Sequence, residues 1–367
     1  MKYLSAFIVI IFLVCCNQSS EKNNSHANNS KEHNWALLPF TKADEVNPVL
    51  LPDTNTIFHC PVRNANVQWE EKDVFNPAAV VRNDTVFLLY RAEDSIGKFA
   101  GTSRIGLAWS TDGLHFTKHP TPVLYPDKDA AKIYEWEGGC EDPRIVEDEN
   151  GTYYTTYTAY DGDKARLLIA SSKDLYHWTK HGSVFTDTAD VNKWSKSGSI
   201  VCRYENGKAI AVKVNGKYYM YWGDTDIFLA ASDDLIHWTI IKDESGNTKP
   251  IFGPRPKKFD SRLVEPGPPA MLTDNGIVLI YNSMNLGSNG DTTLAEGTYA
   301  ASQILFDKKD PAKVVDRMET YFMKPDKPYE ITGQVNHVCF VEGLVNYKGR
   351  WFLYYGTADS KIAVAVK

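Results

Sequence analysis

A short motif recurs along the chain at a nearly constant spacing. In each copy an apolar run ends in a small residue, an Asp-centred turn follows, and an aromatic residue opens the next apolar run. The copies lie at 105–116, 168–178 and 228–238. Their turn aspartates are Asp112, Asp174 and Asp234, which are 62 (174 − 112) and 60 (234 − 174) residues apart. A period of this kind indicates a fold built from repeated supersecondary units.

A second element recurs out of phase with the first. Runs rich in aromatic and β-branched residues are typical of strands and lie at 86–90, 153–157, 218–222, 278–281 and 351–355. A hairpin turn signal precedes each run, at 82–84, 149–151, 214–216, 273–276 and 347–349. Another short apolar run precedes each turn, at 78–81, 144–146, 209–212, 269–272 and 343–345. Each unit therefore contains a predicted antiparallel hairpin.

Five units of about 60 to 77 residues, each with three or four antiparallel strands, predict an all-β chain folded as a five-bladed β-propeller. A sandwich of short strands, the alternative β-architecture, does not predict such a period. The turn at 306–310 is a degenerate copy of the motif. No long helix is expected, and the best short helical candidate spans 310–319. Residues 36–367 are predicted to form one domain.

The N-terminal segment differs in composition from the repeat. The basic Met1-Lys2 pair precedes an almost wholly apolar run at 3–14, which is too short to cross a bilayer core of roughly 30 Å and is typical of a signal peptide. Cys15-Cys16 follows this run and resembles a bacterial lipobox. We expect 1–16 to be a lipoprotein signal peptide with Cys16 lipidated. Cys15 is the second candidate for the lipid, and an ordinary cleaved signal peptide is the alternative.

Residues 17–35 consist mainly of Asn, Ser, Lys, Glu and His. Such a segment cannot offset its ordering entropy by burying apolar surface, so a flexible tether is expected. The protein would then be attached to the bacterial cell envelope, facing the periplasm or the outer surface. Its contact with the membrane is expected through the lipid only.

Charge and cysteine content exclude several classes of protein. The chain has 40 Lys and Arg against 46 Asp and Glu, a net charge of −6 without a basic block, which argues against a nucleic-acid partner. With 43% hydrophobic residues it is too apolar to be disordered overall. Beyond the signal peptide the dispersed cysteines form no Cys/His cluster, so neither a metal nor a cofactor is expected; they are Cys60, Cys140, Cys202 and Cys339. Disulfide pairing and oligomeric state are left open.

Polar residues stand where the innermost strand of each predicted blade begins. They include Asn76, the Glu141-Asp142 pair, Glu265 and Glu342. Innermost strands converge on the axis of a propeller, so we expect these side chains to face one funnel. Carboxylates accept hydrogen bonds from hydroxyl groups, and two carboxylates flanking a glycosidic bond are the minimum equipment for its hydrolysis. The pattern favours a carbohydrate-active propeller.

Several short motifs lie in or beside these strands: Asn-Pro-Ala-Ala-Val at 76–80, Tyr-Arg-Ala-Glu-Asp at 90–94, Ser-Arg-Ile-Gly at 103–106, Gly-Cys-Glu-Asp-Pro-Arg-Ile at 139–145, Pro-Gly-Pro-Pro at 266–269, Val-Glu-Gly at 341–343 and Tyr-Gly-Thr-Ala-Asp-Ser at 355–360. Together they resemble glycoside hydrolase family 130, over roughly residues 70–367. The resemblance implies a five-bladed propeller that acts on β-mannosides with inversion, either as a phosphorylase or as a hydrolase.

The resemblance also implies roles for individual residues. Asp142 matches the general acid, which protonates the glycosidic oxygen directly or through a substrate hydroxyl group. The positions that hold the mannosyl unit beside the scissile bond match Asn76, Arg91, Ser103, Arg104 and Asp359. For Arg144 two roles stay open, orienting Asp142 or forming a salt bridge.

Two positions distinguish phosphorolysis from hydrolysis. A phosphorylase needs convergent cations for phosphate, and the phosphorylases that this chain resembles place basic residues after the third-blade strand and a histidine after the fourth-blade strand. Asp224 and Asn282 stand there instead. Lys196 is the cation that remains, and we expect it and Asn282 to contact substrate. His337 is expected to line the funnel.

Water is therefore the predicted nucleophile, as in the β-1,2-mannosidases of the family. An inverting hydrolase needs a base across the sugar from the acid, with the two carboxyl groups roughly 6.5–9.5 Å apart. Glu265 is the predicted base, with Asp224 as the second candidate or as a partner sharing the water. An exported hydrolase of β-mannoside oligosaccharides, with β-1,2 linkages favoured, is the leading hypothesis. The alternatives are a phosphorylase, a non-catalytic glycan-binding propeller, and a propeller glycosidase of another sugar such as arabinan.

Overall fold

The computed structural model describes residues 33–367, of which Trp35–Lys367 form one compact unit. The predicted signal peptide, Cys16 and the predicted tether up to residue 32 lie outside the described residues. From residue 33 onward the chain is almost entirely β-structure, with two single-turn helices, α1 (Lys132–Glu135) and α2 (Pro328–Ile331), and a 3-10 turn, η1 (Gly287–Asn289). In this part of the chain no helix is long and apolar enough to cross a membrane.

The strands form successive antiparallel meanders. The first contains β4 (Asp73–Arg82), β5 (Thr85–Glu93), β6 (Ser103–Ser110) and β7 (Thr117–Lys118). Next come β8 (Gly139–Glu147), β9 (Tyr153–Tyr160), β10 (Ala165–Ser172) and β11 (Thr179–Ser183). A further meander contains β12 (Ser199–Ile200), β15 (Tyr218–Trp222), β16 (Phe228–Ser232) and β17 (Trp238–Ile240), with the hairpin β13 (Cys202–Glu205) and β14 (Lys208–Ala211) beside it.

The chain then continues through β18 (Leu263–Pro266) and β19 (Met271–Leu272), both paired with β20 (Ile277–Met284), and on to β21 (Tyr299–Phe306) and β22 (Val314–Arg317). The last meander contains β23 (Cys339–Tyr347), β24 (Arg350–Thr357) and β25 (Lys361–Val366). β1 (Thr41–Lys42) pairs with β25, so a strand from near the N-terminus completes this meander.

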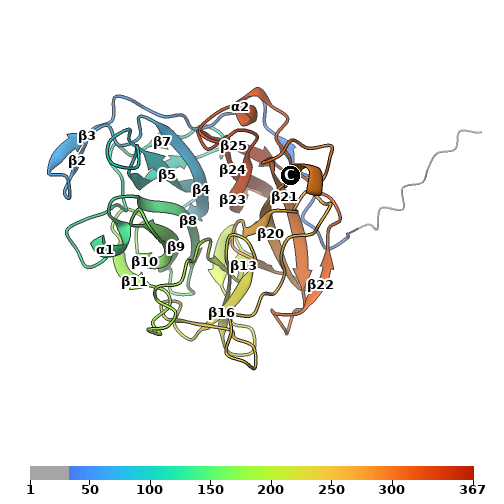
Figure 1. Ribbon diagram of the computed structural model, residues 1–367. Helices are drawn as coiled ribbons and strands as arrows, with labels where there is room; N and C mark the ends of the chain where they lie inside the picture. Colours follow the sequence, from blue (N-terminus) through green and yellow to red (C-terminus); the bar gives the residue numbers. More distant parts are fainter. Residues whose placement is uncertain (1–32) are drawn as a thin grey trace, which may run out of the picture. The chain divides into compact units, whose positions relative to one another are not determined.

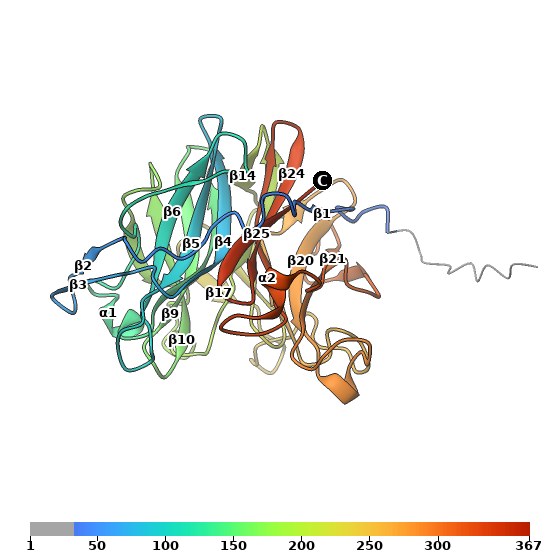
Figure 2. The same cartoon turned by 90° about the horizontal axis from the view of Figure 1, so that it is seen from above.

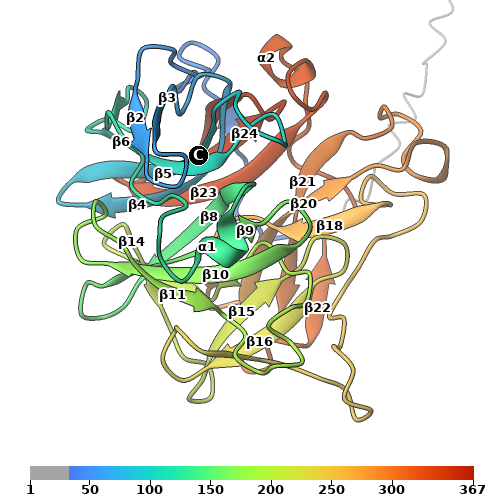
Figure 3. The same ribbon diagram turned by 60° about the vertical axis from the view of Figure 1, so that its left-hand side comes forward.

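The meanders surround a common centre, to which β4, β8 and β23 lie close (Figure 1). Single parallel pairings join neighbouring meanders, between β6 and β8, between β8 and β14, and between β13 and β19. The chain is therefore all-β, with a propeller-like arrangement of antiparallel sheets. A separate hairpin of β2 (Phe58–Cys60) and β3 (Ala65–Val67) lies at the periphery (Figures 1 and 2), and α1 lies beside β9 (Figure 3).

Local turn chemistry explains the hairpins. Asn83 and Asp84 both have positive φ, 50° and 52°, and join β4 to β5 in the two-residue form that favours Asn, Asp and Gly. Lys348 and Gly349, at 50° and 78°, join β23 to β24 in the same way. These turns were predicted at 82–84 and 347–349, and the structure confirms them.

The short helix predicted at 310–319 is wrong. Residues Val314–Arg317 form strand β22, which pairs with β21. Its two valines are β-branched, so they fit a pleated edge strand better than a helix. Both are exposed, so the segment lacks the apolar helical face that a short helix would need for stability.

A cluster of tyrosine, acid and cation recurs in the meanders. In each copy a tyrosine of the second strand donates its hydroxyl hydrogen bond, over 2.8–2.9 Å, to a buried carboxylate that also pairs with a cation. The sets are Tyr90–Glu70–Lys118, Tyr157–Glu135–Lys180, Tyr281–Asp260–Arg317 and Tyr355–Glu330–Lys42. Glu70 and Asp260 lie in loops, Glu135 in α1 and Glu330 in α2, so these clusters attach the segments between strands to the sheets.

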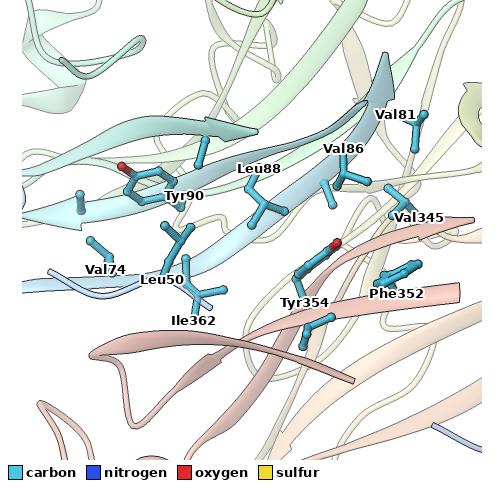
Figure 4. Close-up of a cluster of buried hydrophobic side chains, with 14 of the residues drawn as sticks. Leu50, Val74, Val81, Val86, Leu88, Tyr90, Val345, Phe352, Tyr354 and Ile362 are labelled. Atoms are coloured by element: carbon cyan, nitrogen blue, oxygen red, sulfur yellow. The ribbon is translucent and has the colours of Figure 1, made fainter. Parts of the chain in front are cut away.

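Apolar side chains fill the space between neighbouring meanders. Figure 4 shows Val86, Leu88 and Tyr90 of β5 facing Tyr354 of β24 and Ile362 of β25. All of these residues are fully buried. The inner strands are thereby held rigidly, which fixes the positions of the polar residues that they carry toward the centre.

Candidate active site

Three innermost strands contain a β-bulge opposite the second strand of their meander. The bulged positions are Asn76 in β4, Asp142 in β8 and Glu342 in β23. Asn76 and Asp142 have φ values of 47° and 46°, in the left-handed region that Asn and Asp tolerate better than most residues. A bulge redirects a side chain out of the regular alternation of a strand. Here it brings polar groups from separate meanders to one place.

A cavity of about 110 Å³ lies at this place. It is lined by six of the predicted site residues, Asn76, Arg91, Asp142, Lys196, Glu265 and Asp359. An apolar part of the wall is formed by Tyr299, Val338 and Phe340. A small pocket with convergent charged groups and an apolar wall suits a polyhydroxylated ligand.

Asp142 is held by two donors. Asn76 Nδ2 donates to Oδ1 over 3.0 Å, and Arg91 Nη1 donates to the same oxygen over 3.3 Å. Burial raises the pKa of Asp142, but the charges of Arg91 and Lys196, the Asn76 hydrogen bond and the charge of Arg144 outweigh it, and the pKa lies below its usual value. Asp142 is therefore ionised near neutral pH.

Arg91 is surrounded by carboxylates. Its Nη2 contacts Glu93 Oε1 at 2.6 Å and Glu141 Oε1 at 3.1 Å. Its Nε donates to Ser103 Oγ over 3.0 Å, and Ser103 in turn donates to Glu93. Ser103, predicted to bind substrate, is buried behind Arg91 and does not line the cavity.

Two further carboxyl groups titrate near neutrality. Burial raises the pKa of Glu265 to about 7, although Lys196 and Arg144 oppose this shift. Burial likewise raises the pKa of Asp359 to about 7. Ser197 donates a hydrogen bond to Glu265 Oε1. The cavity thus contains one ionised carboxylate and two carboxyl groups that are about half protonated at pH 7.

Lys196 is the second cation of the cavity. Burial lowers its pKa, but the charges of Glu265, Asp142, Glu141 and Asp224 outweigh this and raise the pKa above its usual value. Lys196 therefore stays protonated, and it partly balances the carboxylates around it.

Besides Ser103, four more predicted site residues lie outside the lining of this cavity. Arg104 is fully buried, and its Nη1 contacts Asp94 Oδ2 at 2.8 Å. Asn282 Nδ2 donates to the carbonyl of Val341 over 2.9 Å, and Asn282 Oδ1 accepts the N–H of Val341 over 2.7 Å. Its amide therefore joins β20 to β23, next to the bulge of β23.

The other two are His337 and Asp224. His337 has φ 59°, and its carbonyl accepts the N–H of Tyr299, which lines the cavity. Asp224 is half-buried, and its Oδ2 accepts a hydrogen bond from the indole of Trp194 over 2.8 Å. Its charge still acts on Lys196 and Glu265, so Asp224 lies close to the cavity.

Glu342 lies buried beneath the predicted site. Burial raises its pKa well above the usual range. Arg144 Nη2 approaches its carboxylate to 3.5 Å, but all three guanidinium nitrogens of Arg144 donate to the carbonyls of Asp142, Pro266 or Gly267. Arg144 therefore connects the strand of the predicted acid with the strand of the predicted base. This supports the orienting role, and its contact with Glu342 supports the salt bridge as well.

Sequence reasoning did not identify several groups at the cavity. Ser197 contacts Glu265, and Tyr299 and Phe340 form part of the wall. Lys196 was predicted, but the sequence pattern does not show which of the neighbouring serines at 195, 197 and 199 reaches the site. The aromatic residues come from segments whose position around the centre depends on the tertiary fold.

A larger groove of about 1000 Å³ lies elsewhere, between the segment that contains α1 and strand β11. Its walls include Tyr125, Tyr134, Tyr176 and Trp178, and it contains none of the predicted site residues. Within residues 33–367 no group of three or more His, Cys, Asp or Glu side chains is placed to hold a metal ion.

Comparison with known families decides the classification. A family model for Glyco_hydro_130, described as "beta-1,4-mannooligosaccharide phosphorylase", matches residues 41–367. The chain belongs to glycoside hydrolase family 130. Family 130 was the family that the sequence motifs resembled, so that prediction is confirmed.

Relatives of this family 130 chain are described either as phosphorylases or as hydrolases. A 1,2-beta-oligomannan phosphorylase of Thermoanaerobacter sp. (strain X514) is 31% identical over 87% of this chain and 94% of its own. A solved glycosyl hydrolase from Bacteroides ovatus is 47% identical, over 90% of this chain and 94% of its own, with a TM-score of 0.88. A second structure, 46% identical over 91% of this chain and 94% of its own with a TM-score of 0.88, is described by the words "The GH130 family of mannoside phosphorylases contains glycoside hydrolases that target beta-1,2 mannosidic linkages in Candida mannan".

Proposed function

We propose that this family 130 enzyme hydrolyses β-mannosides, with β-1,2 linkages favoured, by an inverting mechanism. The observation that carries the proposal is the charge balance at the cavity. Three carboxyl groups line it, from Asp142, Glu265 and Asp359, against the two cations Arg91 and Lys196. A phosphorylase must bind a phosphate dianion, which needs several uncommitted donors or cations.

The cations at this site are already engaged. Arg91 contacts three carboxylates, those of Glu93, Glu141 and Asp142. Arg144 donates to backbone carbonyl groups with all three nitrogens. Lys196 is the remaining cation, and the charges of four carboxylates act on it. Few cations or donors are therefore left uncommitted for phosphate, which favours neutral water as the nucleophile.

The two positions that distinguish the branches support the same conclusion. Asp224 adds a negative charge near Glu265. The Asn282 amide has both its donor and its acceptor bonded to Val341. The names "glycosyl hydrolase" and "glycoside hydrolases that target beta-1,2 mannosidic linkages" occur among relatives at 46–47% identity, whereas the phosphorylase relative is 31% identical.

In the proposed reaction Asp142 gives a proton to the glycosidic oxygen while Glu265 removes one from the attacking water. Asn76, Arg91 and Asp359 hold the mannosyl unit by hydrogen bonds to its hydroxyl groups. Near pH 7 Asp142 is ionised and Glu265 is about half protonated. The reactive form is therefore the minor one in which the proton of the pair resides on Asp142.

Phosphorolysis is the second candidate function. The observation in its favour is that the curated relatives are phosphorylases, among them the 1,2-beta-oligomannan phosphorylase and a beta-1,2-mannobiose phosphorylase that is 30% identical over 82% of this chain. The two candidates share the acid and the mannosyl subsite and differ in the nucleophile alone.

One assay separates them. The purified protein is incubated with β-1,2-mannobiose or β-1,4-mannobiose, with and without inorganic phosphate. We expect mannose without phosphate, released first as the α-anomer by proton NMR, because inversion of a β-mannoside gives that anomer. Asp142→Asn should lower the rate by about 10²–10⁴-fold, and Asp163→Asn, at an exposed loop position, should not. Formation of mannose 1-phosphate that depends on added phosphate would establish the second candidate instead.

We also propose that the meanders are the five blades of a closed propeller, and that the protein is exported and lipid-anchored through Cys16. The blade proposal rests on the sequence period and on the arrangement around a common centre. The anchor rests on the lipobox-like sequence alone. Incorporation of a labelled fatty acid in the bacterial host, lost in Cys16→Ser, tests it, and incorporation retained in that variant but lost in Cys15→Ser would transfer the anchor to Cys15.

A further inference from the structure

The segment between β11 and β12 contacts both carboxylates that compete for the role of base. Trp194 Nε1 donates to Asp224 Oδ2 over 2.8 Å. Three residues later, Ser197 Oγ donates to Glu265 Oε1. Lys196, between the two, lines the cavity. One short segment therefore holds each candidate carboxylate by a different side chain.

Hydrogen bonds on both sides fix this segment. The N–H of Gly223 donates to the carbonyl of Lys196 over 2.9 Å, and Thr156 Oγ1 donates to the carbonyl of Gly198 over 2.7 Å. A Cβ atom at Gly198 would lie 2.8 Å from Met220 Sδ, so the backbone is closely packed there. Ser197 is fully buried at φ 59°, an uncommon conformation for a residue other than glycine. Its hydroxyl group is therefore pre-positioned.

Glu265 has the environment of a base inside the cavity. It is 6% exposed, and it lines the cavity together with Asp142. The Ser197 hydrogen bond engages Oε1, and among residues 33–367 no hydrogen bond to Oε2 is formed. A carboxylate fixed through one oxygen presents the other in a defined direction, which is what abstraction of a proton from a water molecule requires.

Asp224 has a different environment. The residue after Asp224, Thr225, accepts the N–H of Val264 with its carbonyl group. Asp224 therefore lies near β18, the strand that contains Glu265. Its Oδ2 is nevertheless bonded to the indole of Trp194, whose side chain is 48% exposed. Indole N–H is a donor only, so this bond engages one oxygen of Asp224 with a side chain at the rim.

We propose that Ser197 is the positioning residue that makes Glu265 the base, and that Trp194 holds Asp224 at the rim, outside this role. The inference rests on the proposed hydrolysis and specifies its water-activating group. Ser197 acts through Glu265 and touches neither the substrate nor the water.

Azide tests which carboxylate is the base. Azide needs no deprotonation, so it replaces water in a variant that lacks the base: the C1–N bond forms as the C1–O bond breaks with inversion, and Asp142 gives its proton to the leaving oxygen. With β-1,2-mannobiose, Glu265→Ala should lose hydrolysis by about 10²–10⁴-fold and recover turnover in azide, with α-mannosyl azide as product. Asp224→Ala should stay within about threefold of the wild-type rate, because its charge tunes but does not perform the step. Recovery in Asp224→Ala and its absence in Glu265→Ala would overturn the inference.

The test of Ser197 needs a measurement that a purely structural role would leave unchanged. Ser197→Ala should lower kcat about tenfold with KM unchanged, since a lost neutral hydrogen bond to an ionised group corresponds to roughly one order of magnitude. The limb of the pH profile that belongs to Glu265 should move to higher pH, because the hydrogen bond opposes the rise in the pKa of Glu265. Ser197→Gly, which also removes the hydroxyl group but suits a φ of 59°, should show the same two changes, so that backbone strain is not their cause. An unchanged limb would contradict the inference.

Two controls separate the possible failures. Ser183→Ala removes a half-buried serine hydroxyl in β11, which does not line the cavity, and should change neither parameter. Trp194→Phe keeps an aromatic ring and removes the indole N–H, and hydrolysis should persist. If the wild-type protein releases no mannose without phosphate, the proposed function fails. If it does release mannose and the azide experiment points to Asp224, only the inference fails. The azide result also stands if Ser197→Ala does not fold.

Discussion

Asn76 donates a hydrogen bond from Nδ2 to Asp142 Oδ1 over 3.0 Å, although the two residues are 66 positions apart in the chain. Both occupy bulges of innermost strands, and both have left-handed φ values. The other atom of the amide, Asn76 Oδ1, is buried without a hydrogen-bond partner among the described residues. It approaches Gly356 so closely that a Cβ atom there would lie 2.3 Å from it. The amide thus supports the predicted acid with its N–H, its oxygen packs against Gly356, and the residue also forms part of the cavity wall.

Replacement of Asn76 by glycine should affect both functions of this amide. Glycine tolerates the φ of 47°, so the change removes the side chain without straining the backbone. Loss of the Nδ2 hydrogen bond should raise the pKa of Asp142, and the acidic limb of kcat/KM against pH should move upward. Loss of a polar side chain from the cavity wall should increase KM by about tenfold. Asn83→Gly, at φ 50° in an exposed turn, is the matched control. An acidic limb that stays in place would show that Asn76 does not tune the acid.

The pH dependence of kcat/KM follows from the directions in which the pKa values of Asp142 and Glu265 are shifted. The reaction needs one proton on the pair, with Asp142 protonated and Glu265 ionised. The pKa of Asp142 lies below its usual value and that of Glu265 lies at about 7, so between them the pair holds one proton. Above about pH 7 the pair holds none, and kcat/KM should fall tenfold per pH unit. Below the pKa of Asp142 both groups are protonated, and kcat/KM should fall again.

A second group complicates the limb near pH 7. Burial also raises the pKa of Asp359 to about 7. Asp359→Asn should weaken substrate binding but leave the limb in place, whereas Glu265→Gln should abolish it in the residual activity. A limb that disappears in Asp359→Asn instead would assign the titration to Asp359, and the pair described above would then be wrong.

The parts of the fold that depend on local chemistry were predictable from the sequence. The hairpin turns at 82–84 and 347–349 and the aromatic strands beside them follow from short patterns. The segment 310–319 was misread because its single edge strand is too short for a clear period. The tyrosine clusters could not be predicted, since Lys42 pairs with Glu330, 288 residues away. Such pairings depend on how the meanders close in space.

The site was predictable to the extent that its residues lie on bulged inner strands. Asn76, Asp142 and Glu265 line one cavity, as their places at strand entrances suggested. Ser103 and Arg104 are different. Neither lines the cavity: Ser103 supports Arg91, and Arg104 pairs with Asp94. Adjacent residues of a strand point to opposite faces, so the two could not both face the substrate without a bulge between them. Because Ser103 and Arg104 are neighbours in a predicted strand, the sequence already indicated that they would not both face the substrate.

The described cysteines should be unreactive in the native protein. Cys60, Cys140, Cys202 and Cys339 are buried and unpaired. Burial raises the pKa of the last three, so little thiolate forms at neutral pH. We expect peptide mapping after treatment with a thiol reagent to find these four unmodified in buffer and modified in denaturant. A disulfide among them in protein isolated from its host would contradict the structure.

The cluster of Tyr157, Glu135 and Lys180 should contribute strongly to stability. Glu135 is fully buried, and its carboxylate lies 2.8 Å from the hydroxyl of Tyr157 and 2.6 Å from Lys180 Nζ. Lys180→Met leaves the carboxylate without its cation and should lower the free energy of unfolding by about 3–5 kcal/mol, measured by urea denaturation. Lys173→Met, which removes an exposed lysine of β10–β11, should change it by less than about 0.5 kcal/mol.

The loss in Lys180→Met should depend on pH in a defined direction. Burial already raises the pKa of Glu135 in the folded protein, and removal of Lys180 raises it further. A carboxyl group with a raised folded-state pKa costs no stability below its unfolded pKa and progressively more as the pH rises toward the folded value. The difference between variant and wild type should therefore be smallest near pH 4 and grow toward pH 7. In the double variant Glu135→Gln/Lys180→Met, which has no buried charge, this growth should vanish. A loss that is equal at both pH values would mean that packing of the lysine stem, and not its charge, stabilises the cluster.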